Sequence, residues 1–219
     1  MAGLVRRNAL LDMGNANELK DEVKIYYGDL HSPESIALAL YDFQPDEIYN
    51  LASLSSPLGS FSDKLGAIMV TGVGALHVFE RAKQKGLLCF SSPFDESAVD
   101  FLEKLDCPIY KIASLENTHH PLLIKVAQTG KPIIMSTGVS KLEEILESVA
   151  ILKQNGTKDI TLLKCTSNYP CLPEHSNLLT IPLLRQIFPD CNIGLSDHTI
   201  GIGVSIASVA LGGKVIEKH

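Results

Sequence analysis

Short runs of apolar residues alternate with amphipathic stretches through most of the chain. Most apolar runs are continuous, which is typical of strands buried on both faces of a parallel sheet. The stretches between them carry helix signals, so the pattern predicts right-handed βα repeats and an α/β fold. The predicted strands are 23–28, 47–52, 87–91, 108–113, 132–137, 160–165, 192–196 and 214–218.

Capping residues place the ends of several predicted helices. Ser32, followed by Pro33, and Asp95 are expected to cap helices, and Ser140 with Glu143 reads as a capping box. Three glycines precede strands where a left-handed helix terminator is expected, namely Gly86, Gly130 and Gly156.

The first 86 residues differ in texture from the rest. They contain two predicted strands, one short helix and one long helical stretch over 65–86. We therefore predict a boundary near Gly86, with one domain over 1–86 and another over 87–219.

Polar groups follow the predicted strands of the second region at regular intervals. Ser91, Ser114, Thr137, Thr166, Ser196 and His219 succeed one another 23 to 30 residues apart, which is one βα unit per step. Polar groups at the carboxyl ends of parallel strands build the active site of a (β/α)8 barrel. An open doubly wound sheet also places its ligand there, so this pattern predicts the face rather than closure.

Composition narrows the function classes. The net charge of −6, with no cluster of basic residues, argues against nucleic-acid binding. Nothing in the sequence has the length of a membrane span or the apolar core of a signal peptide, so the expected location is cytoplasmic. Five scattered cysteines without a C-x-x-C pair indicate buried thiols rather than a disulfide framework.

Two histidines end neighbouring predicted strands. His198 and His219 could face one point and hold a divalent cation that polarises a substrate carbonyl. The alternative is that one histidine caps the following helix and the other lies at the surface.

Lys111 lies inside an apolar predicted strand, where an unpaired ammonium is costly. With Ser92, Ser114 and Ser136 on neighbouring strand ends it could form a phosphate cradle, or it could form a structural pair with Glu116. Glu116 itself suits an acid/base role or a helix cap. Tyr169 lies in a loop bounded by Pro170 and could merely shape that loop.

The sialic acid synthase family is resembled by the segments SSPFDESAVDFLEKL, YKIASLEN, KPIIMSTG, LLKCTSNYP, GLSDHTIGIG and VALGGKVIEKH. The variants SSPFD, KIAS and CTSNYP look closer to pseudaminic acid synthases of bacterial type than to N-acetylneuraminate synthases. The resemblance covers about 130 residues in order. It implies an incomplete (β/α)8 TIM-type barrel and a condensation of phosphoenolpyruvate with an N-acetylated aldose.

The resemblance also implies a set of site residues. His198 and His219 match the ligands of a Mn²⁺ or Mg²⁺ ion. Glu116, Lys111 and Tyr169 match catalytic or substrate-side positions. The phosphoenolpyruvate contacts, besides Lys111, match Ser92, Ser114, Ser136 and Ser196. Ser167 matches an anion contact where some members carry Asn.

The front of the chain resembles another family. GLVRRNALLD, YYGDLHSPESIALAL, PDEIYNLASLSSPLGSF and VTGVGALHVFERAKQKG are similar to GDP-mannose 4,6-dehydratase, an extended short-chain dehydrogenase with a Rossmann-like fold. The resemblance matches NADP contacts to Arg6, Arg7, Asp29, Leu30, Leu51, Ala52 and Ser53. The segment lacks the glycine-rich turn and the Tyr-x-x-x-Lys pair, so we expect neither dehydratase activity nor NADP binding.

Neither resemblance spans its whole family pattern. The first two barrel strands and the small C-terminal domain of the synthases have no counterpart. We therefore expect a partial synthase fused to a partial dehydratase, with impaired activity. One hypothesis is that the front strands replace the lost barrel strands, with 23–28 pairing with 214–218; the opposing view is that the sheet stays open.

Three functions remain in competition. The first is the condensation to a nonulosonic acid, with phosphoenolpyruvate and an N-acetylated sugar as small-molecule partners and a homo-oligomer left open. The second is a non-catalytic remnant or scaffold that pairs with an intact synthase through its sheet edge. The third is an NADP-dependent nucleotide-sugar dehydratase-like module.

Overall fold

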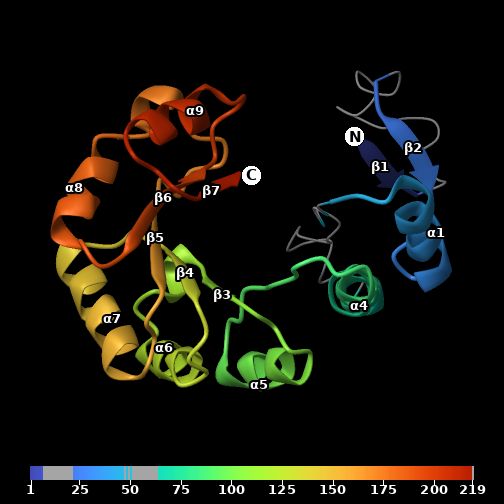
Figure 1. The fold of residues 1–219 in the computed structure, drawn as a ribbon, viewed down its shortest axis with the longest axis horizontal. Coiled ribbons are helices and arrows are strands. Elements are labelled where there is room, and N and C mark those ends of the chain that lie inside the picture. Colours follow the sequence, from blue (N-terminus) through green and yellow to red (C-terminus); the bar gives the residue numbers. More distant parts are fainter. Residues whose placement is uncertain (7–21, 47, 49, 51–63, 219) are drawn as a thin grey trace. The chain divides into compact units, whose positions relative to one another are not determined.

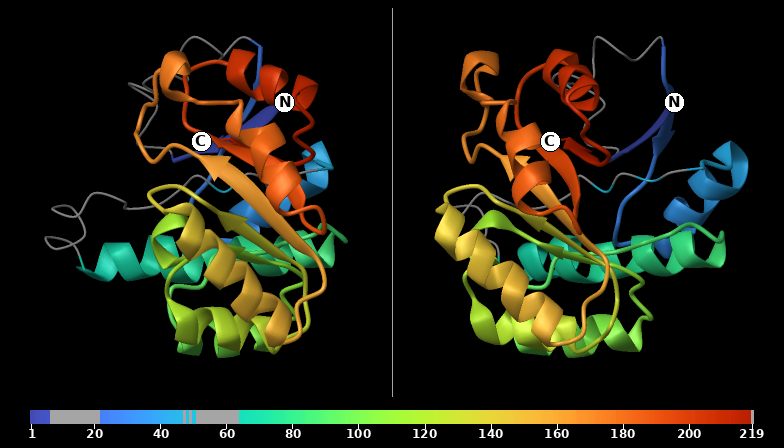
Figure 2. Two further views of the ribbon diagram at one scale, coloured as in Figure 1. Left: turned by 90° about the vertical axis from the view of Figure 1, so that its left-hand side faces the viewer. Right: turned by 60° about the vertical axis from the view of Figure 1, so that its left-hand side comes forward.

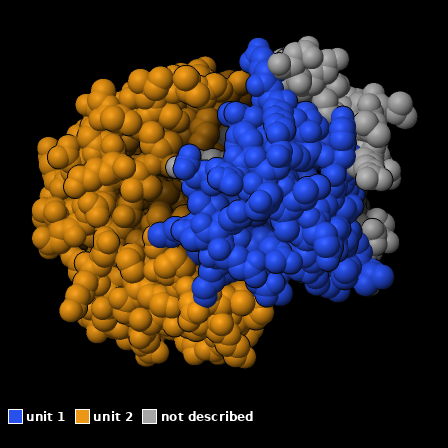
Figure 3. All heavy atoms as spheres, turned by 45° about the vertical axis from the view of Figure 1, so that its right-hand side comes forward, with its two compact units in different colours: residues 1–89 blue, residues 90–219 orange. Residues whose placement is uncertain are grey.

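The computed structural model describes residues 1–6, 22–46, 48, 50 and 64–218. The chain divides into two compact units, residues 1–89 and 90–219 (Figure 3).

The first unit contains a small parallel sheet. Strand β1 (Ala2–Val5) pairs with β2 (Lys24–Tyr27) from Ala2–Lys24 to Val5–Tyr27. Helix α1 (Pro33–Phe43) follows β2, and its N-cap is Ser32, whose Oγ accepts from the Ser35 amide at 3.3 Å. The predicted cap is confirmed. Strand β1 was not predicted, because it is only four residues long.

The long helical stretch has an irregular middle. It consists of α3 (Lys64–Ala67), a π-helical segment (Ile68–Gly74) and α4 (Ala75–Gln84). Of the strand predicted over 47–52, only Ile48 and Asn50 are described, and neither lies in a strand.

The second unit is a curled parallel sheet in which the strands follow one another in chain order (Figure 1). The strands are β3 (Tyr110–Ile112), β4 (Ile133–Ser136), β5 (Ile160–Cys165), β6 (Asn192–Asp197) and β7 (Ile216–Lys218). The helices are α5 (Glu96–Lys104), α6 (His120–Ala127), α7 (Leu142–Gln154), α8 (Thr180–Ile187) and α9 (Gly203–Ala210). Short 3₁₀ segments lie at Ser114–Glu116 and Pro173–His175.

The helices cover the outer face of the curled sheet (Figures 1 and 2). Strand residues such as Ile133, Met135 and Leu162 join helix residues such as Leu122 and Leu152 in one buried hydrophobic core. Because side chains alternate along a strand, Ile134 and Ser136 point to the opposite, inner face. This is the architecture of an incomplete (β/α)8 barrel, as predicted.

Two predictions about local structure are wrong. Residues 87–91 form no strand: a single bridge joins Ser91 to Tyr110, and Leu88 and Phe90 stay exposed, so no hydrophobic cover supports a longer ladder. The box at the start of α7 is shifted by one residue, because Glu144, not Glu143, accepts from the Lys141 amide at 2.7 Å.

Other local predictions are confirmed. The Asp95 carboxylate caps α5 by accepting from the Ala98 amide at 2.8 Å. Gly86, Gly130 and Gly156 have φ values of 76°, 68° and 116°, as a left-handed helix terminator requires.

The hypothesis that 23–28 pairs with 214–218 concerns strands of two different units and stays a prediction. Within the first unit β2 pairs with β1, and within the second unit β7 pairs with β6.

Candidate active site at the carboxyl ends of the strands

The inner face of the sheet carries a row of polar side chains. The registers place Ser136 opposite Leu163, Cys165 opposite Ser196, and Ser196 opposite Glu217. Neighbours in a parallel ladder point to the same face, so these side chains and Lys111 share the inner face.

The Glu217 carboxylate is the centre of this row. Ser196 Oγ donates to Glu217 Oε2 at 2.5 Å, and Ser136 Oγ lies 3.5 Å from the same oxygen. Lys111 Nζ forms an ion pair with Glu217 Oε1 at 3.4 Å and donates to Ser136 Oγ at 2.8 Å. Three donors from three strands therefore converge on one carboxylate.

Lys111 is only 7% exposed. Burial lowers the pKa of its ammonium group, and the negative charge of Glu217 opposes that shift. Of the two alternatives for Lys111, the structural pair with Glu116 is not the one formed, because the ion-pair partner is Glu217. The buried cation is thus paired with a carboxylate of the protein itself, and the phosphate cradle stays a prediction.

A second cluster forms where three strand ends meet at Gly138. The Gly138 amide donates to Ser114 Oγ at 3.1 Å. A Cβ atom at Gly138 would lie 2.3 Å from Ser167 Oγ and 3.0 Å from Cys165 Sγ. This position needs glycine because the neighbouring loops approach its backbone so closely.

The 3₁₀ turn after β3 adds two polar residues. Glu116 Oε2 is buried and has no hydrogen-bond partner among the described residues. Asn117 is 1% exposed, and its side-chain Nδ2 donates to Ser136 O at 3.3 Å and to Ser140 Oγ at 2.6 Å. Asn117 therefore ties the turn after β3 to the end of β4.

His198 follows β6 and is 6% exposed. Its Nδ1 lies 2.8 Å from the Thr166 carbonyl, which can only accept, so Nδ1 carries the proton. Nε2 is therefore the ring nitrogen through which His198 would bind a metal. The Tyr169 ring lies 4.0 Å from the His198 ring, with an interplanar angle of 35°.

Asp197, on the opposite face of β6, anchors the segment that carries His198. It accepts from Thr199 N at 2.8 Å and Ser205 Oγ at 2.5 Å, and pairs with Lys218 at 3.4 Å. Burial raises the pKa of Asp197, but these partners outweigh it and keep the pKa below its usual range.

The remaining predicted site residues are only partly brought together. Ser92 is half-buried beside β3. The second predicted metal ligand, His219, lies outside the described residues. Within the described part of the chain, no group of three or more His, Cys, Asp or Glu side chains is placed to hold a metal ion.

Of the predicted NADP contacts in the first unit, the structure describes Asp29, Leu30 and Arg6. The Asp29 carboxylate accepts from the His31 amide at 2.9 Å, and the Leu30 carbonyl lies 2.9 Å from His77 Nδ1. Arg6 is exposed after β1. Four further residues lie outside the described residues, namely Arg7, Leu51, Ala52 and Ser53.

Sequence reasoning missed three polar residues of the second unit. Glu217 precedes His219 by two positions, so strand alternation could have placed it on the inner face. Lys164 is a buried cation within the apolar strand β5, the signal that singled out Lys111, and burial lowers its pKa. Asn117 gave no signal, because only the folded turn buries it.

Together the fold and the cluster define a partial (β/α) barrel whose inner face carries Lys111, Ser136 and Ser196 around the Glu217 carboxylate, at the carboxyl ends of its strands. The model of the NeuB family matches residues 65–219, most of the chain, and the chain belongs to this family. The GDP-mannose 4,6 dehydratase model matches residues 1–93, so both resemblances are confirmed.

Named relatives fall within the same group of enzymes. The pseudaminic acid synthase of Helicobacter pylori is 45% identical over 142 residues, which are 65% of this chain and 42% of that protein. The N,N'-diacetyllegionaminic acid synthase of Campylobacter jejuni is 46% identical over 140 residues, 63% of this chain and 42% of that protein. The chain thus spans about two fifths of the length of these relatives.

A solved structure shows the same fold. The N-acetylneuraminic acid synthetase of Leptospira borgpetersenii, crystallised with citrate, superposes with a TM-score of 0.67 at 30% identity. The match covers 87% of this chain and 70% of that chain.

No helix in the described residues is long and apolar enough to cross a membrane.

Proposed function

We propose that this chain binds phosphoenolpyruvate on the inner face of its sheet and condenses it with an N-acetylated aldose to form a nonulosonic acid. The observation that carries the proposal is the convergence of Lys111, Ser136 and Ser196 on one carboxylate. A site that holds the carboxylate of Glu217 has the charge and donors to hold the anionic groups of phosphoenolpyruvate.

Lys111 and the serines bind and orient the first substrate. The ammonium group neutralises one anionic group, and the hydroxyls of Ser136 and Ser196 donate to its oxygens. Ser114 and Ser167, near Gly138, are placed at the adjoining strand ends and would hold the second anionic group, with Ser92 beside them.

The reaction forms one carbon–carbon bond and releases phosphate. The methylene carbon of phosphoenolpyruvate attacks the aldehyde carbon, whose oxygen becomes a hydroxyl after protonation. Water adds at the resulting cationic carbon and loses a proton, which leaves a hydroxyl there. The bond from this carbon to the bridging oxygen then breaks, and the hydroxyl gives its proton to the departing phosphate and becomes the ketone of the product. The role of the protein is positioning and charge stabilisation.

His198 and His219 would hold Mn²⁺ or Mg²⁺, which when bound polarises the sugar aldehyde. Nδ1 of His198 contacts Thr166 O, so Nε2 is the ring nitrogen that would bind the metal. His219 directly follows Lys218, whose Cα partner is Asp197, the residue before His198.

Glu116 and Tyr169 are proposed to face the sugar. The buried carboxylate oxygen of Glu116, without a partner in the described residues, suits a bond to a sugar hydroxyl. Tyr169 is 68% exposed beside His198, where it could cover the sugar ring.

The names of the relatives support a nonulosonic acid as product, and they divide between different sugars. We also place the enzyme in the cytoplasm, which is supported by five free cysteines.

The test is a phosphoenolpyruvate-dependent condensation assay with Mn²⁺. It offers N-acetylmannosamine and the N-acetylated precursor sugar of pseudaminic acid in parallel, with an intact relative as positive control. Product that disappears in His198→Ala and persists in His175→Ala, a change at a histidine outside the site, supports the proposal. No product from this chain while the relative is active would favour the non-catalytic remnant.

A further inference from the structure

The centre of the candidate site is occupied by a group of the protein itself. The Glu217 carboxylate, whose side chain is 29% exposed, receives the hydroxyls of Ser136 and Ser196 and the ammonium of Lys111. These are the groups proposed above to bind phosphoenolpyruvate. One set of donors cannot hold two anions at the same point, because like charges a few ångströms apart repel each other strongly in a partly buried site.

We propose that the Glu217 carboxylate occupies the anion-binding position formed by Lys111, Ser136 and Ser196 in the unliganded protein. It is displaced from this position when a phosphate-bearing ligand binds. The proposal rests on the proposed function of the site. It adds that the Glu217 carboxylate competes with the ligand for the same donors and so lowers the affinity for the ligand.

The placement of Glu217 allows this exchange. It lies on β7, a three-residue strand whose pairing in the described residues is with β6 alone. Its side chain is partly exposed, whereas the hydrophobic core lies on the other face of the sheet. The carboxylate can therefore turn toward solvent without opening the core.

The contacts also explain why such an occupant is useful. Lys111 is buried, and burial alone lowers the pKa of its ammonium group. Glu217 keeps a negative charge beside Lys111 and keeps the hydroxyls of Ser136 and Ser196 oriented toward the anion-binding position. An incoming phosphate group then pairs with Lys111 and accepts from the two hydroxyls in place of Glu217. The donors are therefore already oriented before the ligand binds.

The experiment is a calorimetric titration of the full chain with inorganic phosphate. Four variants are compared with the unchanged chain: Glu217→Gln, Glu217→Asp, Lys111→Met and Asp159→Asn. Asp159→Asn is the matched control, because it removes one negative charge from an exposed residue just before β5, at the amino ends of the strands. Thermal unfolding of each variant establishes that it is folded.

We expect Glu217→Gln to bind phosphate about fivefold or more tightly than the unchanged chain, since it removes the competing charge at a few ångströms. Glu217→Asp keeps the charge on a shorter side chain and should bind with intermediate affinity. Asp159→Asn should stay within about twofold of the unchanged chain, because exposed charges at long range are screened. Lys111→Met should lose binding.

The outcomes separate this inference from the proposed function. Equal or weaker binding by Glu217→Gln, together with loss of binding in Lys111→Met, overturns the displacement and leaves the site intact. Equal tightening by Asp159→Asn also overturns it, since net charge would then explain the effect. Binding that survives Lys111→Met, or no binding in any variant, contradicts the site itself.

Discussion

Lys111 shows how a single residue defines the site. A buried ammonium group is costly unless an anion meets it, and here the anion is the Glu217 carboxylate at 3.4 Å. The sequence alone shows Lys111 within an apolar run, so a buried cation could be predicted. Its partner could not, because Glu116 lies five positions away in sequence, whereas Glu217 is brought beside it by four strand crossovers.

Gly138 is a residue at which the ends of neighbouring strands approach one another closely. Gly138→Ala would place a Cβ atom 2.3 Å from Ser167 Oγ and 2.9 Å from Ser114 Oγ. We expect it to destabilise the fold by about 1–3 kcal/mol through overpacking and to weaken phosphoenolpyruvate binding. Denaturant unfolding and a ligand titration measure the two effects.

Gly203→Ala is the matched control, since nothing lies within 4 Å of the added atom. An unfolding free energy and an affinity for Gly138→Ala equal to those of Gly203→Ala would show that the strand ends do not meet as described.

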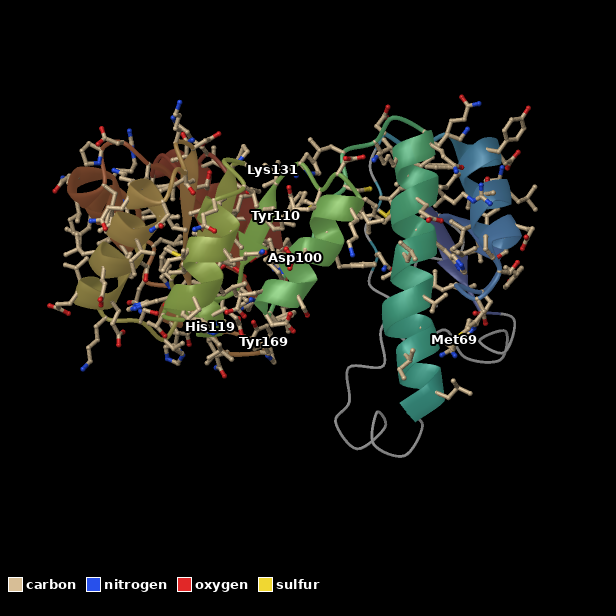
Figure 4. The ribbon with its side chains drawn as sticks, turned by 90° about the horizontal axis from the view of Figure 1, so that it is seen from below. Met69, Asp100, Tyr110, His119, Lys131 and Tyr169 are labelled. Atoms are coloured by element: carbon tan, nitrogen blue, oxygen red, sulfur yellow. The ribbon has the colours of Figure 1, made fainter. Side chains whose placement is uncertain are left out.

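At the scale of elements, polar links hold the first helix of the second unit to its sheet. Glu103 on α5 accepts from Tyr110 Oη at 2.6 Å and pairs with Lys131 at 2.5 Å. Figure 4 labels Tyr110 and Lys131, the latter with its ammonium group 5.9 Å from the Tyr110 ring. One carboxylate thus joins α5 to β3 and to the segment before β4.

This link predicts a pH-dependent contribution to stability. Burial raises the pKa of Glu103, but Lys131 and Tyr110 outweigh it, so the folded-state pKa lies below the ordinary value of 4.5. The contribution is therefore complete above that value and is lost as the pH falls through the lower folded-state pKa.

We expect Glu103→Gln to lower the unfolding temperature at about pH 7 and to make progressively less difference below about pH 4. The effect should be modest, because both partners are partly exposed and solvent screens them. Thermal unfolding across this range measures it; a difference that stayed constant with pH would assign the link to packing rather than charge.

The elements themselves were largely predictable, for a physical reason. Continuous apolar runs such as 160–165 must lie between two covered faces, and the strand there has the predicted bounds. The strand prediction for 87–91 was wrong, because an apolar run becomes a strand only if neighbouring strands pair with it and other side chains cover it. The start of α7 shifted by one residue, since Ser140 instead donates to the Gly138 carbonyl at 3.1 Å.

At the scale of the whole chain, the two units differ in their cores. The hydrophobic cluster that spans Val99 to Leu195 lies entirely within the second unit. Among the described residues of the first unit, the buried apolar side chains are Ile36, Leu40 and Ala82. Family membership could be predicted because the motifs lie in order along the second unit. The pairing of β2 could not be predicted, because its partner β1 is a run of only four residues that gave little signal.

This difference predicts unequal local stability. Amides of β4, β5 and β6 should exchange with solvent hydrogen far more slowly than amides of β1, β2 and α1, because little buried apolar surface protects the first unit. Native-state hydrogen exchange read residue by residue measures this. Equal protection in the two units would mean that the first is stabilised by something other than its own core.

The central claim is that Lys111, Ser136 and Ser196 together bind phosphoenolpyruvate on the inner face of the sheet. The most direct measurement is a calorimetric titration of the full chain with phosphoenolpyruvate. It compares Lys111→Met, Ser136→Ala and Ser196→Ala with Ser97→Ala, a change to a hydroxyl that donates to Asp95 at the start of α5. We expect saturable binding that Lys111→Met abolishes, that each site serine variant weakens by about fivefold or more, and that Ser97→Ala preserves. Binding that survives in Lys111→Met at unchanged affinity would contradict the account.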